Sequence, residues 1–371
     1  MKVKSLLLLG FAASMTFVAC DKNESELGGT DSAAPKSVTI NLANVAPATR
    51  SAGGEVLTAT NDIQLNSYQI FFTDGTNVYQ AKQADGTTPA DQYFDGTSSV
   101  PTEGSYHFLP AAVNKVILIG NHDKIEVSYV DGKATAPNFD LALAIEDEQD
   151  ATALTLYDES ALTAKTPEHT DGNPLYEATL EPTPRVARLF VKSFNCEFSQ
   201  TALYNKLDLG MLALNNYYEV STLAENTVGT LNNITVTAEN VWDWLAGKVK
   251  GEFDNDVFEG EAATDPYNTG AISLTPTAPS KTGVNLYYHV FAGTTVPQLV
   301  LRAVGDNAPL YLPTLRFVDK ENNEITDWEA GMIYEMDFNF ADTDFSQPDK
   351  CIDITVTPVK WAVTTVTPEY K

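Results

Sequence analysis

The sequence predicts an all-β fold, built as two Greek-key β-sandwich domains in tandem with few short helices. Short stretches in which apolar and polar residues alternate recur along most of the chain, and this period of two is typical of strands with one buried face. Turn-forming residues separate these stretches, and helical patterns are few. The 371 residues, 43% of them apolar, are enough for two domains of ordinary size.

The expected strands begin with SVTINLANV at 37–45, in which Val38, Ile40 and Leu42 alternate with polar residues. SYQIFFTDGTNVYQA at 67–81 predicts a hairpin with an Asp-Gly turn. The other expected strands are SYHFL (105–109), NKVILIGN (114–121), KIEVSYV (124–130), RVARLFVKSF (185–194), NNITVTA (232–238), VNLYYHVFAG (284–293), PQLVLRAV (297–304), YLPTLRFV (311–318), MIYEMDFNF (332–340) and CIDITV (351–356). Helices are expected only at 151–165, 203–214 and 241–247.

A domain boundary is expected in TLEPTPRVARLF at 179–190. Pro182 and Pro184 interrupt strand pairing there, and a strongly apolar strand follows them. The expected domains are therefore an N-terminal β-sandwich at 51–183 and a C-terminal β-sandwich at 184–371.

The charge of the chain restricts its partners. With 50 acidic and 23 basic residues, the formal net charge is −27. A surface of this charge repels phosphate backbones, so no nucleic acid is expected as a partner.

The first 20 residues, MKVKSLLLLGFAASMTFVAC, have the order of a secretory signal peptide: two lysines, an uncharged apolar stretch and small residues. The apolar stretch is too short for a comfortable transmembrane helix. Cys20 follows FVA and precedes the polar DKNESE, which resembles the lipobox of bacterial lipoproteins. We therefore expect Cys20 to be lipidated and the polar segment after it to be a tether.

No motif of an enzyme is present, so no catalytic residue, cofactor or metal is expected. The four histidines do not form an HExxH motif, and the sequence has no CxxC motif that could bind a metal with them. The G-x-S-x-G motif and phosphate-binding glycine loops are also absent. The acidic stretches at 145–150 and 252–261 do not fit a calcium-binding loop. The four tryptophans are either core residues or platforms for a carbohydrate, and the core is the more frequent place for them. Cys196 and Cys351 show no spacing that indicates a disulfide, and we expect core or free thiols.

The two ends of the chain suggest an exchange of strands. Arg50 is the only arginine in a linker-like segment, and a protease that cuts after it would free the strand containing Val38, Ile40 and Leu42. The vacated groove would bind a replacement strand, because it exposes a core and unpaired backbone groups. The alternating C-terminal segment at about 350–371 would supply it through Ile352, Ile354, Val356, Val359, Trp361 and Val363. Such a head-to-tail contact does not close and builds a filament. In the alternative interpretation, both segments complete the sheets of their own domains.

Four stretches of the chain are considered together: FVAC (17–20), ATRSAGG (48–54), PRVARLFV (184–191) and ITVTPVKWAV (354–363). With them, the chain resembles the fimbrillins of Bacteroidales, which are type V pilins. The resemblance implies transthyretin-like sandwiches and a precursor lipidated at Cys20 and carried to the outer membrane. An arginine-specific protease would cut between Arg50 and Ser51 and remove the pro-segment at 21–50 with its first strand.

The resemblance also implies which partners the protein binds and where in the cell it is located. The partners would be other copies of the chain, accessory anchor and tip pilins, and a host receptor or glycan. The final location would be a cell-surface fimbria that mediates adhesion. A C-terminal segment fit for donation favours a shaft subunit over a tip subunit. The alternative function is an anchored surface lipoprotein that binds a glycan or a host protein; a secreted hydrolase lacks any motif.

Overall fold

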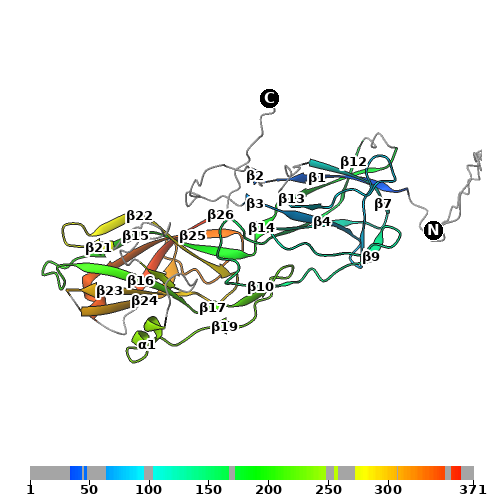
Figure 1. Ribbon diagram of the computed structural model, residues 1–371. Helices are drawn as coiled ribbons and strands as arrows, with labels where there is room; N and C mark the ends of the chain where they lie inside the picture. The colour runs from blue at the N-terminus through cyan, green and yellow to red at the C-terminus, as the bar shows by residue number, and fades with distance from the viewer. Residues whose placement is uncertain are drawn as a thin grey trace, which may run out of the picture. The chain divides into compact units, whose positions relative to one another are not determined.

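The computed structural model describes residues 34–43, 46–47, 64–95, 103–166, 172–247, 255–257, 272–306, 308–346 and 352–360 (Figure 1). Within these ranges, the only helices are α1 (Val241–Ala246) and the 3-10 helix η1 (Asp342–Ser346). No helix in the described part of the chain is long and apolar enough to cross a membrane. The predictions of an all-β fold and of a helix at 241–247 are confirmed.

The first of the larger sheets in the described residues has four strands in the order β12-β13-β1-β7. Its strands are β1 (Lys36–Leu42), β7 (Glu103–Leu109), β12 (Thr163–Lys165) and β13 (Leu175–Leu180). β1 is an interior strand, because it pairs in parallel with β13 on one side and antiparallel with β7 on the other. Figure 1 shows β1, in blue, among these three strands.

The second sheet has seven described strands in the order β14-β11-β8-β4-β5-β9, with β6 also paired to β4. They are β4 (Tyr68–Thr73), β5 (Asn77–Tyr79), β6 (Tyr93–Phe94), β8 (Lys115–Gly120), β9 (Lys133–Thr135), β11 (Leu156–Ala161) and β14 (Thr183–Pro184). The predicted hairpin is confirmed as β4 and β5, with Gly75 at a φ of +94° in its turn. The two sheets share one apolar core, in which the rings of Phe72 (β4) and Tyr106 (β7) lie 4.9 Å apart.

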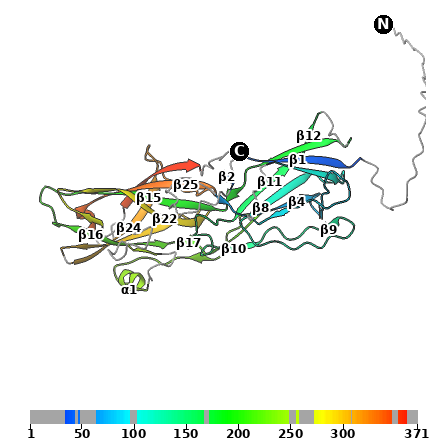
Figure 2. The ribbon, with the colours of Figure 1, turned by 45° about the horizontal axis from the view of Figure 1, so that its top comes forward.

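The third sheet has nine described strands in the order β20-β16-β23-β24-β26-β25-β15-β22, with β21 paired to β16. Figure 2 shows the sheet, with β15, β16, β22, β24 and β25 labelled. They are β15 (Val186–Glu197), β16 (Leu207–Asn215), β20 (Asn255–Val257), β21 (Ile272–Leu274), β22 (Ser280–Phe291), β23 (Gln298–Gly305), β24 (Ala308–Val318), β25 (Met332–Ala341) and β26 (Ile352–Lys360). Three short pairs complete the described pairing: β10 (Ala142–Ala144) with β18 (Val220–Thr222), β17 (Tyr217–Tyr218) with β19 (Leu231–Asn232), and β2 (Ala46–Pro47) with β3 (Gln64–Leu65).

The chain passes from the seven-stranded to the nine-stranded sheet at Arg185, between β14 and β15. The Arg185 guanidinium donates from Nε to the carbonyl of Leu223 at 2.5 Å and from Nη2 to that of Ala224 at 2.7 Å. It also lies 4.8 Å from the ring centroid of Tyr157, so this crossing point is held by several contacts. The division into domains at 51–183 and 184–371 stays a prediction.

Two predicted helices are wrong. Residues 151–165 contain β11 and β12, and 203–214 contain most of β16. Both stretches place apolar residues three and four apart as well as two apart, so their spacing fits either period. Tertiary pairing decides between them: β11 pairs with β8, and β16 pairs with β23.

Two predicted strands are also wrong, because a side-chain amide takes the place of a partner strand. The stretches 124–130 and 232–238 have no ladder beyond an isolated bridge at Val130 and the two-residue β19. The Gln69 amide exchanges two hydrogen bonds of 2.9 Å with the backbone of Ile125, and the Asn215 amide exchanges two of 3.0 Å with that of Ile234. Within each extended segment, a pair of hydrogen bonds from one amide side chain replaces the ladder of a partner strand.

Candidate functional site

The apolar face of β1 is part of the core. Val38 is 1% exposed, Ile40 2% and Leu42 9%, and all three belong to the main apolar core cluster, which also contains buried residues of β7 and β13. Burying a side chain of this kind contributes about 1.5–3 kcal/mol. The residues predicted for the displaced strand thus lie together, and loss of β1 would uncover a continuous apolar surface between β7 and β13.

The N-terminal end of β1 makes polar contacts instead. The Lys36 ammonium donates to the carbonyl of Val113 at 2.6 Å and lies 4.5 Å from the ring centroid of Tyr176. Burial lowers the pKa of Lys36 from its ordinary value. The buried hydroxyl of Ser37 lies 3.1 Å from Nδ1 of His107, on β7. This hydrogen bond ties β1 to its antiparallel neighbour.

The linker with the predicted cleavage site lies outside the described residues, as do Cys20, Arg50 and Ser51. The described residues on its two sides are paired, because β2 at Ala46–Pro47 runs parallel to β3 at Gln64–Leu65. A cut between these two short strands would separate β1 covalently from the rest of the fold.

The described part of the C-terminal segment is β26. This strand lies between β24, with which it pairs in parallel, and β25, with which it pairs antiparallel. Ile354 and Val356 are fully buried there. Ile352 and Val359 belong to the same strand, whereas Trp361 and Val363 lie outside the described residues.

β1 and β26 occupy positions of the same kind. Each is an interior strand with a parallel neighbour on one side and an antiparallel neighbour on the other. The structure therefore shows β26 completing the sheet of its own chain, and among the described strands β26 pairs with β24 and β25, whereas β7 and β13 pair with β1.

A buried polar cluster joins β15, β22 and the turn at Glu148. His289 is fully buried; it accepts a hydrogen bond at 3.0 Å from Nε of Arg188, and its Nδ1 lies 2.7 Å from the Glu148 carbonyl. These contacts fit the neutral tautomer with a proton on Nδ1. Burial first, and then the charge of Arg188, lower the pKa of His289 well below its ordinary value of 6.5. The Gln149 amide also exchanges hydrogen bonds with the His289 backbone, at 2.9 and 3.0 Å.

We expect this cluster to make stability depend on pH. Below a pH of about 6.5 the unfolded chain protonates His289 before the folded chain does, so the free energy of unfolding falls with falling pH, by up to about 1.4 kcal/mol per unit. His289→Gln keeps a donor for the Glu148 carbonyl and an acceptor for Arg188 but does not titrate. Urea unfolding of both proteins at pH 7.5, 6.5 and 5.5 measures the difference in slope. The buried carboxyl of Glu148, whose pKa burial raises, is present in both proteins and cancels. If the free energy of unfolding had the same pH dependence in both proteins, His289 would not be the group that causes it.

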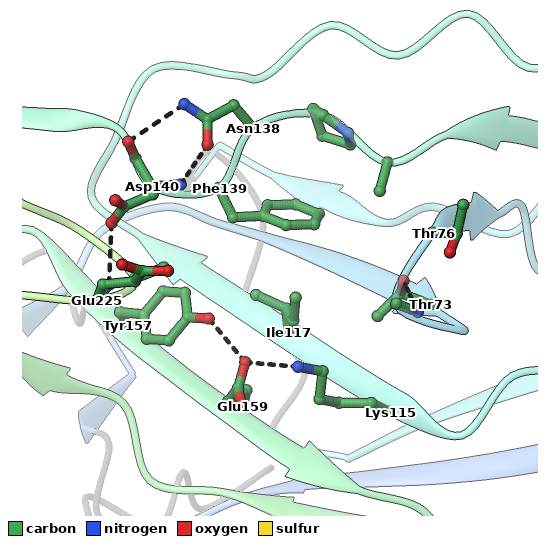
Figure 3. A pocket seen from close by; sticks show the side chains of 14 residues that line it. Thr73, Thr76, Lys115, Ile117, Asn138, Phe139, Asp140, Tyr157, Glu159 and Glu225 are labelled. Atoms are coloured by element: carbon green, nitrogen blue, oxygen red, sulfur yellow. Dashed lines mark hydrogen bonds and ion pairs between the residues drawn. The ribbon is translucent and has the colours of Figure 1, made fainter.

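A pocket of about 520 Å³ lies on the second sheet and is lined from several elements (Figure 3). On its floor, the Glu159 carboxylate accepts hydrogen bonds from Lys115 and from the Tyr157 hydroxyl, both at 2.9 Å. The hydrogen bond from Lys115 lowers the pKa of Glu159. On its wall, Asp140 accepts a hydrogen bond from the backbone of Glu225 at 2.9 Å. These groups satisfy one another and do not form a nucleophile with a base beside it.

The pocket was not predicted from the sequence. Most of its lining residues come from β8, β11 and the loop before β10, and the others come from β4, the turn after it and residues 224–225. Tyr157 lies in a stretch that the sequence predicts as helical. In the described residues, no group of three or more His, Cys, Asp or Glu side chains is placed to hold a metal ion.

The sequence predicts the tryptophans as core residues, with carbohydrate platforms as the less frequent alternative, and the cysteines as core or free thiols. Trp328 is 2% exposed and packs against Phe317 and Tyr334, which confirms the core interpretation for this residue. Trp242 and Trp244 are partly buried against a smaller apolar cluster, and Trp361 lies outside the described residues. Cys196 is a free, buried thiol, and burial raises its pKa to about 12.

The described residues define an all-β protein of several sheets, in which β1 is an interior strand. Comparison with known proteins shows which fold it shares. No protein-family model and no curated protein matches the chain. The chain is similar to the structure of a fimbrilin from Porphyromonas gingivalis, with 11% identity, a TM-score of 0.52, and coverage of 89% of this chain and 98% of that one. It is also similar to the structure of a protein from Parabacteroides distasonis described as a cell adhesion protein, with 13% identity, a TM-score of 0.50, and coverage of 90% and 99%. At these identities, the likeness shows a shared fold.

Proposed function

We propose that this protein is a structural subunit of a cell-surface fimbria that polymerises when a strand of one copy replaces β1 of the next. The observation that carries the proposal is the position of β1. The strand directly before the Arg50 linker is an interior strand, with Val38 and Ile40 buried and with hydrogen-bonded neighbours on both sides. The fold shared with a fimbrilin supports it.

In the proposed sequence of events, the precursor is lipidated at Cys20 and carried to the outer membrane. An arginine-specific protease cuts between Arg50 and Ser51. The cut removes the covalent link between β1 and the rest of the sheet, so β1 can leave together with the lipid. The groove that it vacates exposes the backbone edges of β7 and β13 and binds an extended segment with alternating apolar side chains.

The replacement strand comes from the C-terminal segment, 350–371, of a second copy. β26 shows that part of this segment already pairs as an interior strand with the same combination of neighbour directions as β1. A subunit that both gives and accepts a strand is a shaft subunit, and its contacts extend into a filament. Accessory anchor and tip pilins end the filament, which carries adhesion to a host receptor or glycan. The function is structural and not enzymatic.

The first test is the N-terminal sequence and intact mass of the protein taken from its own cells. We expect the chain to start at Ser51 and to give ladders of high mass on gels of unheated samples. A chain that starts at a lipidated Cys20 and gives no ladder would instead support an anchored surface lipoprotein that binds a glycan or a host protein.

A further inference from the structure

The pairing of β1 with β7 contains an irregularity at Ser37. Lys36 lies opposite Leu109 and Val38 opposite Tyr106, so two residues of β7 face the single residue Ser37. This is a β-bulge, formed by His107 and Phe108. A bulge fixes the register of the strand that pairs with it, because it accepts one position of that strand and no other.

The bulge is held in place independently of β1. Phe108 has a φ of +56°, in the left-handed region, and its ring packs against Gly86, where an added Cβ would meet the ring at 3.1 Å. The backbone of His107 exchanges hydrogen bonds of 2.9 and 3.0 Å with Lys82. Since these contacts do not involve β1, the bulge is a property of the groove.

The groove presents the ring of His107 to the position of Ser37. Ser37 is 1% exposed and His107 is 4% exposed, and the hydroxyl lies 3.1 Å from Nδ1 of the ring. An apolar side chain in place of Ser37 could not form the hydrogen bond that the Ser37 hydroxyl makes with Nδ1 of His107. The next outward-facing residue, Thr39, is partly exposed and lies opposite Ser105, outside the bulge.

We propose that His107 makes this groove selective for a strand with a hydroxyl side chain, Ser or Thr, at the position of Ser37, and that this contact sets the register of the strand that replaces β1. The inference rests on the proposed function and names the partner chemistry of its groove. The alternation of apolar residues already opposes a slip by one residue, because such a slip would turn every core-facing side chain outward. A slip by two residues keeps the alternation, and the contact at the position of Ser37 opposes it where the shifted residue has no hydroxyl. The C-terminal segment of a second copy offers hydroxyl side chains at Thr355, Thr357, Thr364, Thr365 and Thr367.

The experiment follows exchange of β1 in the chain from Asp21 to Lys371 after cutting at Arg50. A labelled synthetic peptide with the β1 sequence KSVTINL is added in excess, and its incorporation is measured by size-exclusion chromatography. Peptides with Ser37→Thr and Ser37→Val form the decisive pair, because Thr and Val have nearly the same shape and differ in the hydroxyl. Ser37→Ala tests loss of the hydroxyl without added volume, and Thr39→Val is the matched control on the exposed side.

The peptides with Ser and Thr are expected to bind about tenfold more tightly than those with Ala and Val, the effect of one buried hydrogen bond. Thr39→Val is expected to change binding by less than about twofold. In a chain with His107→Ala, the difference between the Ser and Ala peptides should disappear, which assigns the selectivity to this ring. Equal binding of Ser and Ala peptides, together with equal binding of Thr and Val peptides, would overturn the inference. Failure of the unchanged β1 peptide to enter the cut chain would overturn the proposed function itself.

Discussion

A chain with Arg50→Ala is expected to stay uncut, to keep its N-terminal segment and to form no polymer. The reason is the competition for the groove between β7 and β13. A strand that remains covalently linked to its groove has an effective concentration on the order of millimolar. A strand from a second copy, at far lower concentration and with similar contacts, cannot displace it. The expected readouts are a mass that includes the pro-segment and a single band on unheated gels.

The control for this prediction restores the cut without restoring the arginine. Placing the recognition sequence of an unrelated protease at 51–56 of the Arg50→Ala chain should return polymerisation when that protease is added. Fibres of normal length from Arg50→Ala with its pro-segment intact would show that removal of β1 is not the trigger.

The sequence was sufficient to predict β1 as a strand but not as an interior strand. Alternation of Val38, Ile40 and Leu42 shows that one face is buried, and the structure confirms this burial. The neighbours of β1 come from far along the chain, and nothing in a local pattern says which edges they offer. The same holds for β26, whose alternation predicts a strand but not its position inside its own sheet.

The polar contacts of the site could not be predicted from local sequence patterns either, because they also depend on residues that are distant in the sequence. His107 lies in a stretch correctly predicted as a strand, but its role depends on a bulge that is stabilised by Lys82 and Gly86. The stretches 124–130 and 232–238 show the opposite case, in which a local pattern predicts a strand that the structure does not form. Their alternation is real, but the partner of each backbone is one amide side chain, Gln69 or Asn215, which no spacing rule includes.

The position of β26 decides how donation has to be tested. Deletion of 352–371 would remove Ile354 and Val356 from the interior of the nine-stranded sheet and separate β24 from β25. Loss of these two buried side chains alone is expected to cost roughly 3–6 kcal/mol, a large part of the stability of an ordinary domain. Failure of that variant to polymerise would therefore not distinguish donation from unfolding.

Deletion of 361–371 is the informative variant. It leaves β26 in place, so we expect thermal unfolding within a few degrees of the unchanged chain and normal cutting at Arg50. If Trp361, Val363 and the residues after them supply the replacement strand, this variant accepts a strand but cannot give one, and added in excess to unchanged subunits it should cap their filaments and shorten them. The full-length chain with Trp361→Ala and Val363→Ala provides a milder version, in which filaments form but dissociate faster on heating. Filaments of normal length from the deletion variant alone would place the donor within β26, and each subunit would then have to open its own sheet between β24 and β25 before it could polymerise.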